Sequence, residues 1–221
     1  MAKKFDTSKI IEPIMRFVNM KGVIALKDGM LAILPLTVIG SVFLIIGQIP
    51  SEAINTAIAG VFGKSWTEPF MQVHAGTFAI MGLIACFSIG YAYAKNESIE
   101  PLPSGVLSVA AFFITLRSSF TTPDGETVDA LARVWFGGQG IVGAIIIGLS
   151  VGAIYSFFIK NNIVIKMSKQ VPDAISKQFA AMIPAFAIFL LSMIVYIVAK
   201  AASGGTFIEW IYSVIQVPLQ G

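Results

Sequence analysis

Residues 135–159 read WFGGQGIVGAIIIGLSVGAIYSFFI, a stretch without a single Asp, Glu, Lys or Arg. As an α-helix it would be about 37 Å long, whereas the hydrocarbon core of a bilayer is about 30 Å thick. A helix in lipid satisfies its own backbone hydrogen bonds, so an apolar helix of this length suits a membrane. The stretch therefore predicts a transmembrane helix.

Four further uncharged runs have the same character and cover residues 29–51, 69–94, 101–116 and 178–199. In the whole chain 56% of the residues are hydrophobic and 12% are charged. This composition leaves too few polar residues to cover the surface of a soluble globular protein of 221 residues. We therefore expect an all-α polytopic membrane protein. The net charge of +3 is no signature of nucleic-acid binding.

The positions of the 15 basic residues predict how the chain crosses the membrane, because Lys and Arg are retained on the cytoplasmic side. If all five runs cross the membrane, 11 of the 15 basic residues are cytoplasmic, including Lys160, Lys166, Lys169 and Lys177. If the short run 101–116 does not cross, the number is 10 and the four-lysine loop lies outside. We therefore predict five transmembrane helices and a cytoplasmic N-terminus.

The segments between and beyond the runs complete the expected organisation. Residues 1–28 place apolar side chains at roughly helical spacing among basic ones, which is typical of an amphipathic helix on the inner membrane surface. The loop 117–133 contains Thr122-Pro123-Asp124-Gly125, which predicts a turn in a polar external loop. The expected domains are the amphipathic segment 1–28 and a membrane domain over 29–200, which residues 201–221 follow.

Small residues recur at every fourth position in two of the runs. The series are Gly140, Ala144, Gly148, Gly152 and Ser156 in one run, and Gly82, Cys86, Gly90 and Ala94 in the other. Residues with this spacing share one face of a helix, and small side chains let two helices approach closely in lipid. The first series is either a packing face within the chain or a subunit interface.

Residues suited to chemistry are scarce. His74 is the only histidine and lacks a neighbouring cluster at metal-ligand spacing, so we expect no metal, no cofactor and no catalytic residue. The single cysteine, Cys86, is expected to pack in its apolar run. No run contains a charged residue of the kind that marks polar-substrate sites in membranes, which also disfavours an intramembrane hydrolase. Ser104, Asn161 and Asn162 are only polar candidates.

Two segments carry a resemblance to a known family. Residues 31–50, LAILPLTVIGSVFLIIGQIP, resemble the first span of the membrane-embedded IIC components of the phosphoenolpyruvate-dependent sugar phosphotransferase system, in the lactose, cellobiose and diacetylchitobiose branch. Residues 137–141, GGQGI, and the segment 160–186 are similar to that branch's fourth span and following loop, with the family-motif residues Val171, Pro172, Phe179 and Pro184 in place. Asp173 departs from the pattern, since relatives often have proline there.

The resemblance covers the whole chain but only about the first half of a family member. It implies a bacterial plasma-membrane permease in which the first five spans form the interface domain of a homodimer, residues 201–221 start the linker to a substrate-binding domain, and the sugar site lies in the second half. The resemblance also favours the subunit-interface interpretation of the series from Gly140 to Ser156 over packing within the chain. It also implies import of a β-linked disaccharide such as cellobiose, lactose or diacetylchitobiose, phosphorylated by a cysteine of a IIB partner within a IIA–IIB relay, so that the chain is a transporter component rather than an enzyme. The alternative from the residues alone is a membrane scaffold or docking protein complete in itself.

Overall fold

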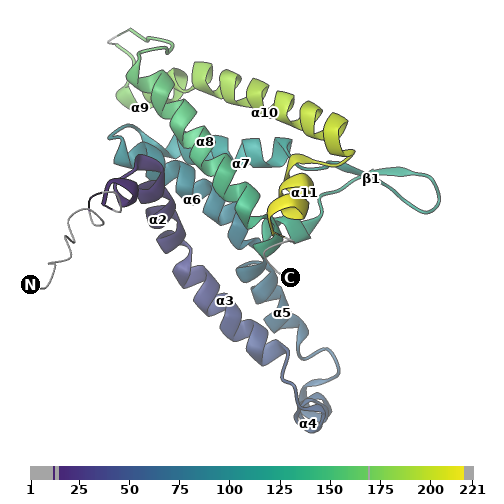
Figure 1. Cartoon of the computed structure of the whole chain (residues 1–221). Coiled ribbons are helices and arrows are strands. Elements are labelled where there is room, and N and C mark those ends of the chain that lie inside the picture. Colours follow the sequence, from purple (N-terminus) through teal and green to yellow (C-terminus); the bar gives the residue numbers. More distant parts are fainter. Residues whose placement is uncertain (1–11, 13–14, 169, 217–221) are drawn as a thin grey trace, which may run out of the picture.

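The structure is a computed structural model and describes residues 12, 15–168 and 170–216. Most of these residues are helical, and the helices form one bundle from which an arm and a β-hairpin project (Figure 1). The expected helical class is correct for the bundle and the arm. The hairpin is an addition that the sequence did not predict.

The centre of the bundle is helix α6 (Met81–Asn96), which packs against its three neighbours α2 (Lys21–Ala32), α7 (Pro101–Ile114) and α8 (Ile141–Lys160). Its Ile89 side chain is fully buried, as is Phe112 of α7. Proline at the start of α7 costs no hydrogen bond, because the first helical N–H groups have no partner within the helix.

Helices α6 and α8 run parallel to each other. Gly82 near the start of α6 lies against the backbone of Gly137 just before α8, and at the other end Glu97 pairs with Lys160. Helix α7 and residues 115–140 therefore return the chain to the end of the bundle where α6 began.

The run 29–51 forms two helices rather than one. Helix α2 ends at Ala32, and α3 (Leu34–Gly47) leaves it at an angle of 41°. Pro35 in the first turn of α3 explains the break, since proline lacks the N–H that would continue the hydrogen bonds of α2. Helix α2 also runs through residue 28 without interruption, so no break marks the expected boundary between surface segment and membrane domain.

Part of that surface segment, residues 1–11 and 13–14, lies outside the described residues. Within the described part, α2 is held on the bundle rather than apart from it. Ala25 and Gly29 are buried, and a Cβ on Gly29 would stand 2.6 Å from the Ile89 side chain.

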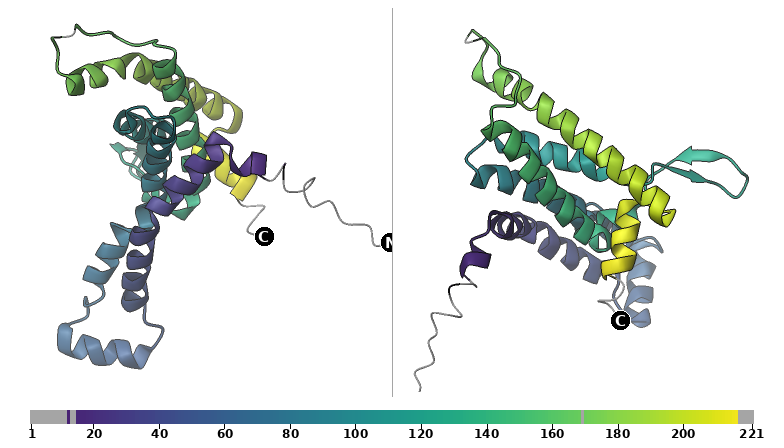
Figure 2. Two further views of the ribbon diagram at one scale, coloured as in Figure 1. Left: turned by 90° about the vertical axis from the view of Figure 1, so that its left-hand side faces the viewer. Right: turned by 45° about the horizontal axis from the view of Figure 1, so that its top comes forward.

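The arm consists of α3, α4 (Glu52–Phe62) and α5 (Glu68–Ala75), followed by the 3₁₀ turn η1 (Phe78–Ile80) that leads into α6. The Ser51 hydroxyl caps α4 by accepting a hydrogen bond from the Ile54 N–H at 3.5 Å. The left view of Figure 2 shows α4 lying across the ends of α3 and α5.

Three stretches of the described residues are long and apolar enough to cross a membrane, namely Glu68–Asn96, Gly138–Lys160 and Ile175–Ser203. The bent pair α2–α3 makes a fourth only if its two helices are counted as one span. Helix α7 has 14 residues and spans only about 21 Å, so the expected number of five is not confirmed.

The loop 117–133 contains the predicted turn, with Gly125 at φ 84°, but its flanks pair as antiparallel strands. Strand β1 (Ser119–Thr121) aligns with β2 (Thr127–Asp129), and Phe120 lies opposite Val128. Alternating polar and apolar residues over three positions were too short a signal to predict these strands.

After the hairpin come the 3₁₀ turns η2 (Arg133–Phe136) and η3 (Gly138–Gly140), and after α8 come α9 (Asp173–Ala180) and α10 (Met182–Ser203). The chain then folds back through α11 (Phe207–Ile211) and the π-helical turn η4 (Tyr212–Gln216). Helix α11 starts with a capping box between Thr206 and Glu209, and its Ile208 is buried against Gly143 of α8.

Candidate functional site

The stripe of small residues on α8 faces α6 of the same chain. A Cβ on Gly148 would stand 2.8 Å from the Cys86 carbonyl oxygen, and a Cβ on Gly152 would stand 2.5 Å from the Tyr93 Cβ. Ala144 and Ser156 of α8 are buried as well, whereas Gly140 lies in η3 just before the helix, where a Cβ would collide with the Trp135 carbonyl oxygen. These contacts support the packing alternative, because a face filled by α6 is not available to a second subunit.

The second stripe, on α6, is joined to α7 by hydrogen bonds as well as by close packing. The Ser104 hydroxyl donates to the Gly90 carbonyl at 2.7 Å, and the Cys86 thiol donates to the Ser108 carbonyl at 3.3 Å. Within α7 the Ser108 hydroxyl donates to the Ser104 carbonyl at 2.8 Å. A Cβ on Gly90 would collide with the Ser108 hydroxyl. Ser104, a polar candidate from the sequence, therefore has a structural partner.

The two asparagine candidates lie at the end of α8. The Asn161 side-chain amide donates to the Phe157 carbonyl at 2.7 Å, and the same carbonyl accepts the Asn161 backbone N–H at 3.1 Å. Asn162 has a φ of 55° and turns the chain out of the helix. These contacts give both residues a role in ending α8.

An ion-pair cluster that the sequence did not predict joins three helices at one end of the bundle. The Glu97 carboxylate, whose side chain is 7% exposed, binds the Lys21 ammonium at 2.7 Å and also binds the Lys160 ammonium. Hydrogen bonds from Lys160 and then Lys21 lower the pKa of the Glu97 carboxyl below its usual value. The sequence contains one signal for this cluster, because Glu97 and Glu100 are the two acidic residues in the short segment between the runs 69–94 and 101–116.

At the opposite end of the bundle a cavity of about 600 Å³ is lined by the segments around His74 and Gln139. The His74 ring stacks on Phe78 with centroids 5.4 Å apart, and its Nδ1 atom is buried without a hydrogen-bond partner among the described residues. Arg133 supplies a cation to the rim of the cavity. Within the described residues no group of three His, Cys, Asp or Glu side chains could hold a metal ion.

The family-motif residues lie around α9. Pro172 precedes the helix and accepts a hydrogen bond from the Ile175 N–H at 3.0 Å, after a turn in which the Val171 N–H donates to the Ser168 carbonyl. Phe179 is 38% exposed, while Pro184 is buried in the first turns of α10. Asp173 is the first residue of α9, where a carboxylate interacts favourably with the helix dipole.

Comparison with known proteins identifies the family. The sequence profile described as "Phosphotransferase system, EIIC" matches residues 27–219. The chain belongs to this EIIC family. It is 35% identical over 201 residues to the lichenan permease IIC component of Bacillus subtilis (strain 168), covering 88% of the chain and 44% of that protein. It is 30% identical to the cellobiose-specific EIIC component of Geobacillus stearothermophilus, again over 88% of the chain and over 45% of the relative.

Among solved structures, the EIIC chain is similar to the transporter ChbC, the IIC component from the N,N'-diacetylchitobiose-specific phosphotransferase system. The TM-score is 0.89 at 28% identity, over 98% of this chain and 51% of that chain. The EIIC chain thus spans about half the length of the relatives it matches. The resemblance inferred from the segments 31–50 and 160–186 is confirmed.

Proposed function

We propose that these residues form the interface domain of an EIIC permease that imports a β-linked disaccharide such as cellobiose, lactose or diacetylchitobiose. The proposal rests on structural similarity, since 98% of the chain matches 51% of a diacetylchitobiose-specific IIC component. The buried Ser104 and Ser108 hydroxyls are both engaged within the bundle, which supports placing the sugar site outside these residues. Sugar recognition needs several converging polar groups.

The proposed topology has five membrane passages with a cytoplasmic N-terminus. Its support is that Lys21, Glu97 and Lys160 meet at one end of the bundle, which is the cytoplasmic end by the lysine count. Helix α7, although short, must return the chain between the parallel helices α6 and α8. Phosphoryl transfer to the sugar would come from IIB, supplied by IIA, at this cytoplasmic end.

The proposed permease is a homodimer, as the family resemblance implies. Since the Gly148 face of α8 is filled by α6, we place the subunit contacts elsewhere. The arm and α10 carry many exposed apolar side chains, such as Ile45 at 69% and Phe186 at 72%, that could meet lipid or a second subunit.

The test of the proposed function is uptake of radiolabelled cellobiose, lactose and diacetylchitobiose by cells with and without the gene that encodes the chain. We expect the deletion to abolish intracellular accumulation of the phosphorylated form of one of these sugars. Unchanged uptake of all three would favour the scaffold alternative. A phosphorylated product distinguishes transport coupled to phosphoryl transfer from simple facilitated entry.

A further inference from the structure

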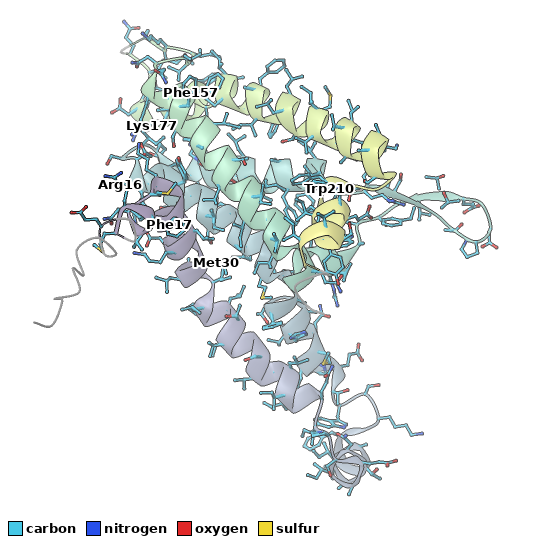
Figure 3. All side chains as sticks on the ribbon, viewed as in Figure 1. Arg16, Phe17, Met30, Phe157, Lys177 and Trp210 are labelled. Carbon is cyan, nitrogen blue, oxygen red and sulfur yellow. The ribbon has the colours of Figure 1, made fainter. Side chains whose placement is uncertain are left out.

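Helix α11 is too short to be stable by itself. It has five residues, Phe207–Ile211, whereas an isolated helix in water is only marginally stable below about 12 residues. Contacts with the rest of the chain therefore have to hold it. Figure 3 shows Trp210 of this helix at the opposite end of the bundle from Phe157 and Lys177.

One set of contacts is apolar. Ile208 is 1% exposed and Ile211 is 5% exposed, and the two residues lie one helical turn apart on the same face of α11. A Cβ on Gly143 of α8 would stand 3.2 Å from the Ile208 Cγ1 atom, so the helices meet closely at this point. The Tyr212 ring then packs edge-on against Trp135, with centroids 5.5 Å apart. Helix α11 is thus docked beside the start of α8.

The other set of contacts converges on one carboxylate oxygen, Glu209 Oε2. This atom accepts the Thr206 backbone N–H at 2.7 Å and lies 3.5 Å from the Arg117 guanidinium. The Thr206 hydroxyl in turn accepts the Glu209 N–H at 3.4 Å, which completes the capping box. The Arg117 guanidinium also lies 5.8 Å from the centre of the Phe120 ring in β1. Glu209 therefore joins the first turn of α11 to the base of the hairpin.

The docked segment has clear limits on both sides. Before it, a Cβ on Gly205 would stand 2.8 Å from Glu209 Oε2, so a glycine leaves room for the carboxylate to reach the Thr206 N–H. After Tyr212 the burial ends, because Val214 is 54% exposed and Ile215 is 38% exposed. This exposed stretch lies in the π-helical turn η4.

We propose that Glu209 is a latch that holds residues 206–212, here called the α11 segment, on the bundle, and that this segment opens as one unit when the contacts of Glu209 break. Cap and packing are lost together, because so short a helix does not persist without them. While the latch is closed, the chain after Tyr212 leaves the bundle from a fixed point beside α8. The α11 segment then belongs with the bundle, although the family resemblance implies a linker from residue 201. The proposal does not rest on sugar transport.

Hydrogen–deuterium exchange of the purified chain, read by mass spectrometry, tests whether the latch acts locally. We expect the amides of 209–212 to be protected, and Glu209→Gln to speed their exchange about fivefold without changing that of α6 or α8. Glu126→Gln is the matched control, because it removes an exposed carboxylate from the nearby hairpin. Unprotected amides in the wild type, no change in Glu209→Gln, or the same acceleration in Glu126→Gln, α6 or α8 would overturn the proposal.

Thiol labelling tests whether the packing opens together with the cap. In a Cys86→Ala background, Ile211→Cys carries its thiol on the buried face and Ser213→Cys carries one in the exposed stretch. We expect position 211 to react slowly, and about fivefold faster once Glu209→Gln is added, whereas position 213 should react fast in both backgrounds. A rate at position 211 that does not respond to Glu209→Gln would show that the cap and the packing are independent, and would overturn the latch.

Discussion

Gly148 of α8 lies against the backbone of Cys86 in α6, so close that a Cβ at position 148 would stand 2.8 Å from the Cys86 carbonyl oxygen. The partner atom belongs to the backbone of a central helix and cannot rotate away. The close approach of α6 and α8 therefore depends on glycine at this position.

We predict that Gly148→Leu impairs folding rather than leaving a folded monomer. Four side-chain carbons would have to enter space that α6 fills, at a cost above about 2 kcal/mol. Yield and melting temperature in detergent measure the effect. Ile146→Leu, which keeps the side-chain volume on another face of α8, is the control and should behave as wild type. A well-folded, stable Gly148→Leu protein would contradict the packing of α8 on α6.

Replacing either of two glycines that have free space around them with alanine should change the stability of the protein in opposite directions. Gly204 ends α10 with φ 70°, and Gly204→Ala should destabilise by about 1 kcal/mol because a Cβ disfavours this conformation. Gly60 lies in α4 with nothing near its Cβ position, so Gly60→Ala should stabilise by up to about 1 kcal/mol. Thermal melting of both variants tests the pair, and a shift of the same sign in both would refute it.

The ion pairs of Glu97 predict a pH dependence of stability. Lys160 and Lys21 lower the pKa of this carboxyl, so its ionised form stabilises the fold above the ordinary glutamate pKa of about 4.3, and this stabilisation is lost as the pH falls through the lowered value. Glu97→Gln should therefore melt below wild type at pH 7, and the difference should shrink in acid. Asp124→Asn on the exposed hairpin is the control. A difference that grows as the pH falls would contradict the prediction.

The topology can be tested with single cysteines in a Cys86→Ala background. An impermeant thiol reagent added to intact cells should label Asp124→Cys in the hairpin but not Lys166→Cys in the loop after α8, because lysine-rich loops stay cytoplasmic. Permeabilised cells should label both positions. Labelling of position 166 alone in intact cells would invert the orientation.

Residues 1–221 alone should show no saturable binding of cellobiose, lactose or diacetylchitobiose in calorimetry, because the buried Ser104 and Ser108 hydroxyls are engaged in helix packing and no set of converging polar groups remains. The cavity around His74 offers the sharpest check, since the His74 Nδ1 atom has no hydrogen-bond partner in the described part of the chain and Arg133 lies on the rim. Binding that is lost in His74→Phe or Arg133→Gln would place a sugar site here and overturn the prediction.

The sequence alone determined the membrane class, three of the long apolar helices and the family. Those properties are local, since the length of an uncharged run such as 135–159 indicates that the segment lies in lipid, whatever helices pack against it. The motif around Val171 and Pro172 is equally local. A span at 101–116 stays a prediction for the same reason, because this run is too short to decide by length alone.

Only the tertiary structure decided which surfaces meet. The spacing of Gly140 to Ser156 shows that these residues share a face, but their partner became apparent only once α6 and α8 were seen to run parallel. Glu97 and Lys160 are 63 positions apart, so no pattern in either segment could pair them. Lys177 of α9 and Glu100 also form an ion pair, although they are 77 positions apart. Contacts between distant segments depend on how all the helices pack together, and periodicity within one helix carries no information about its partner.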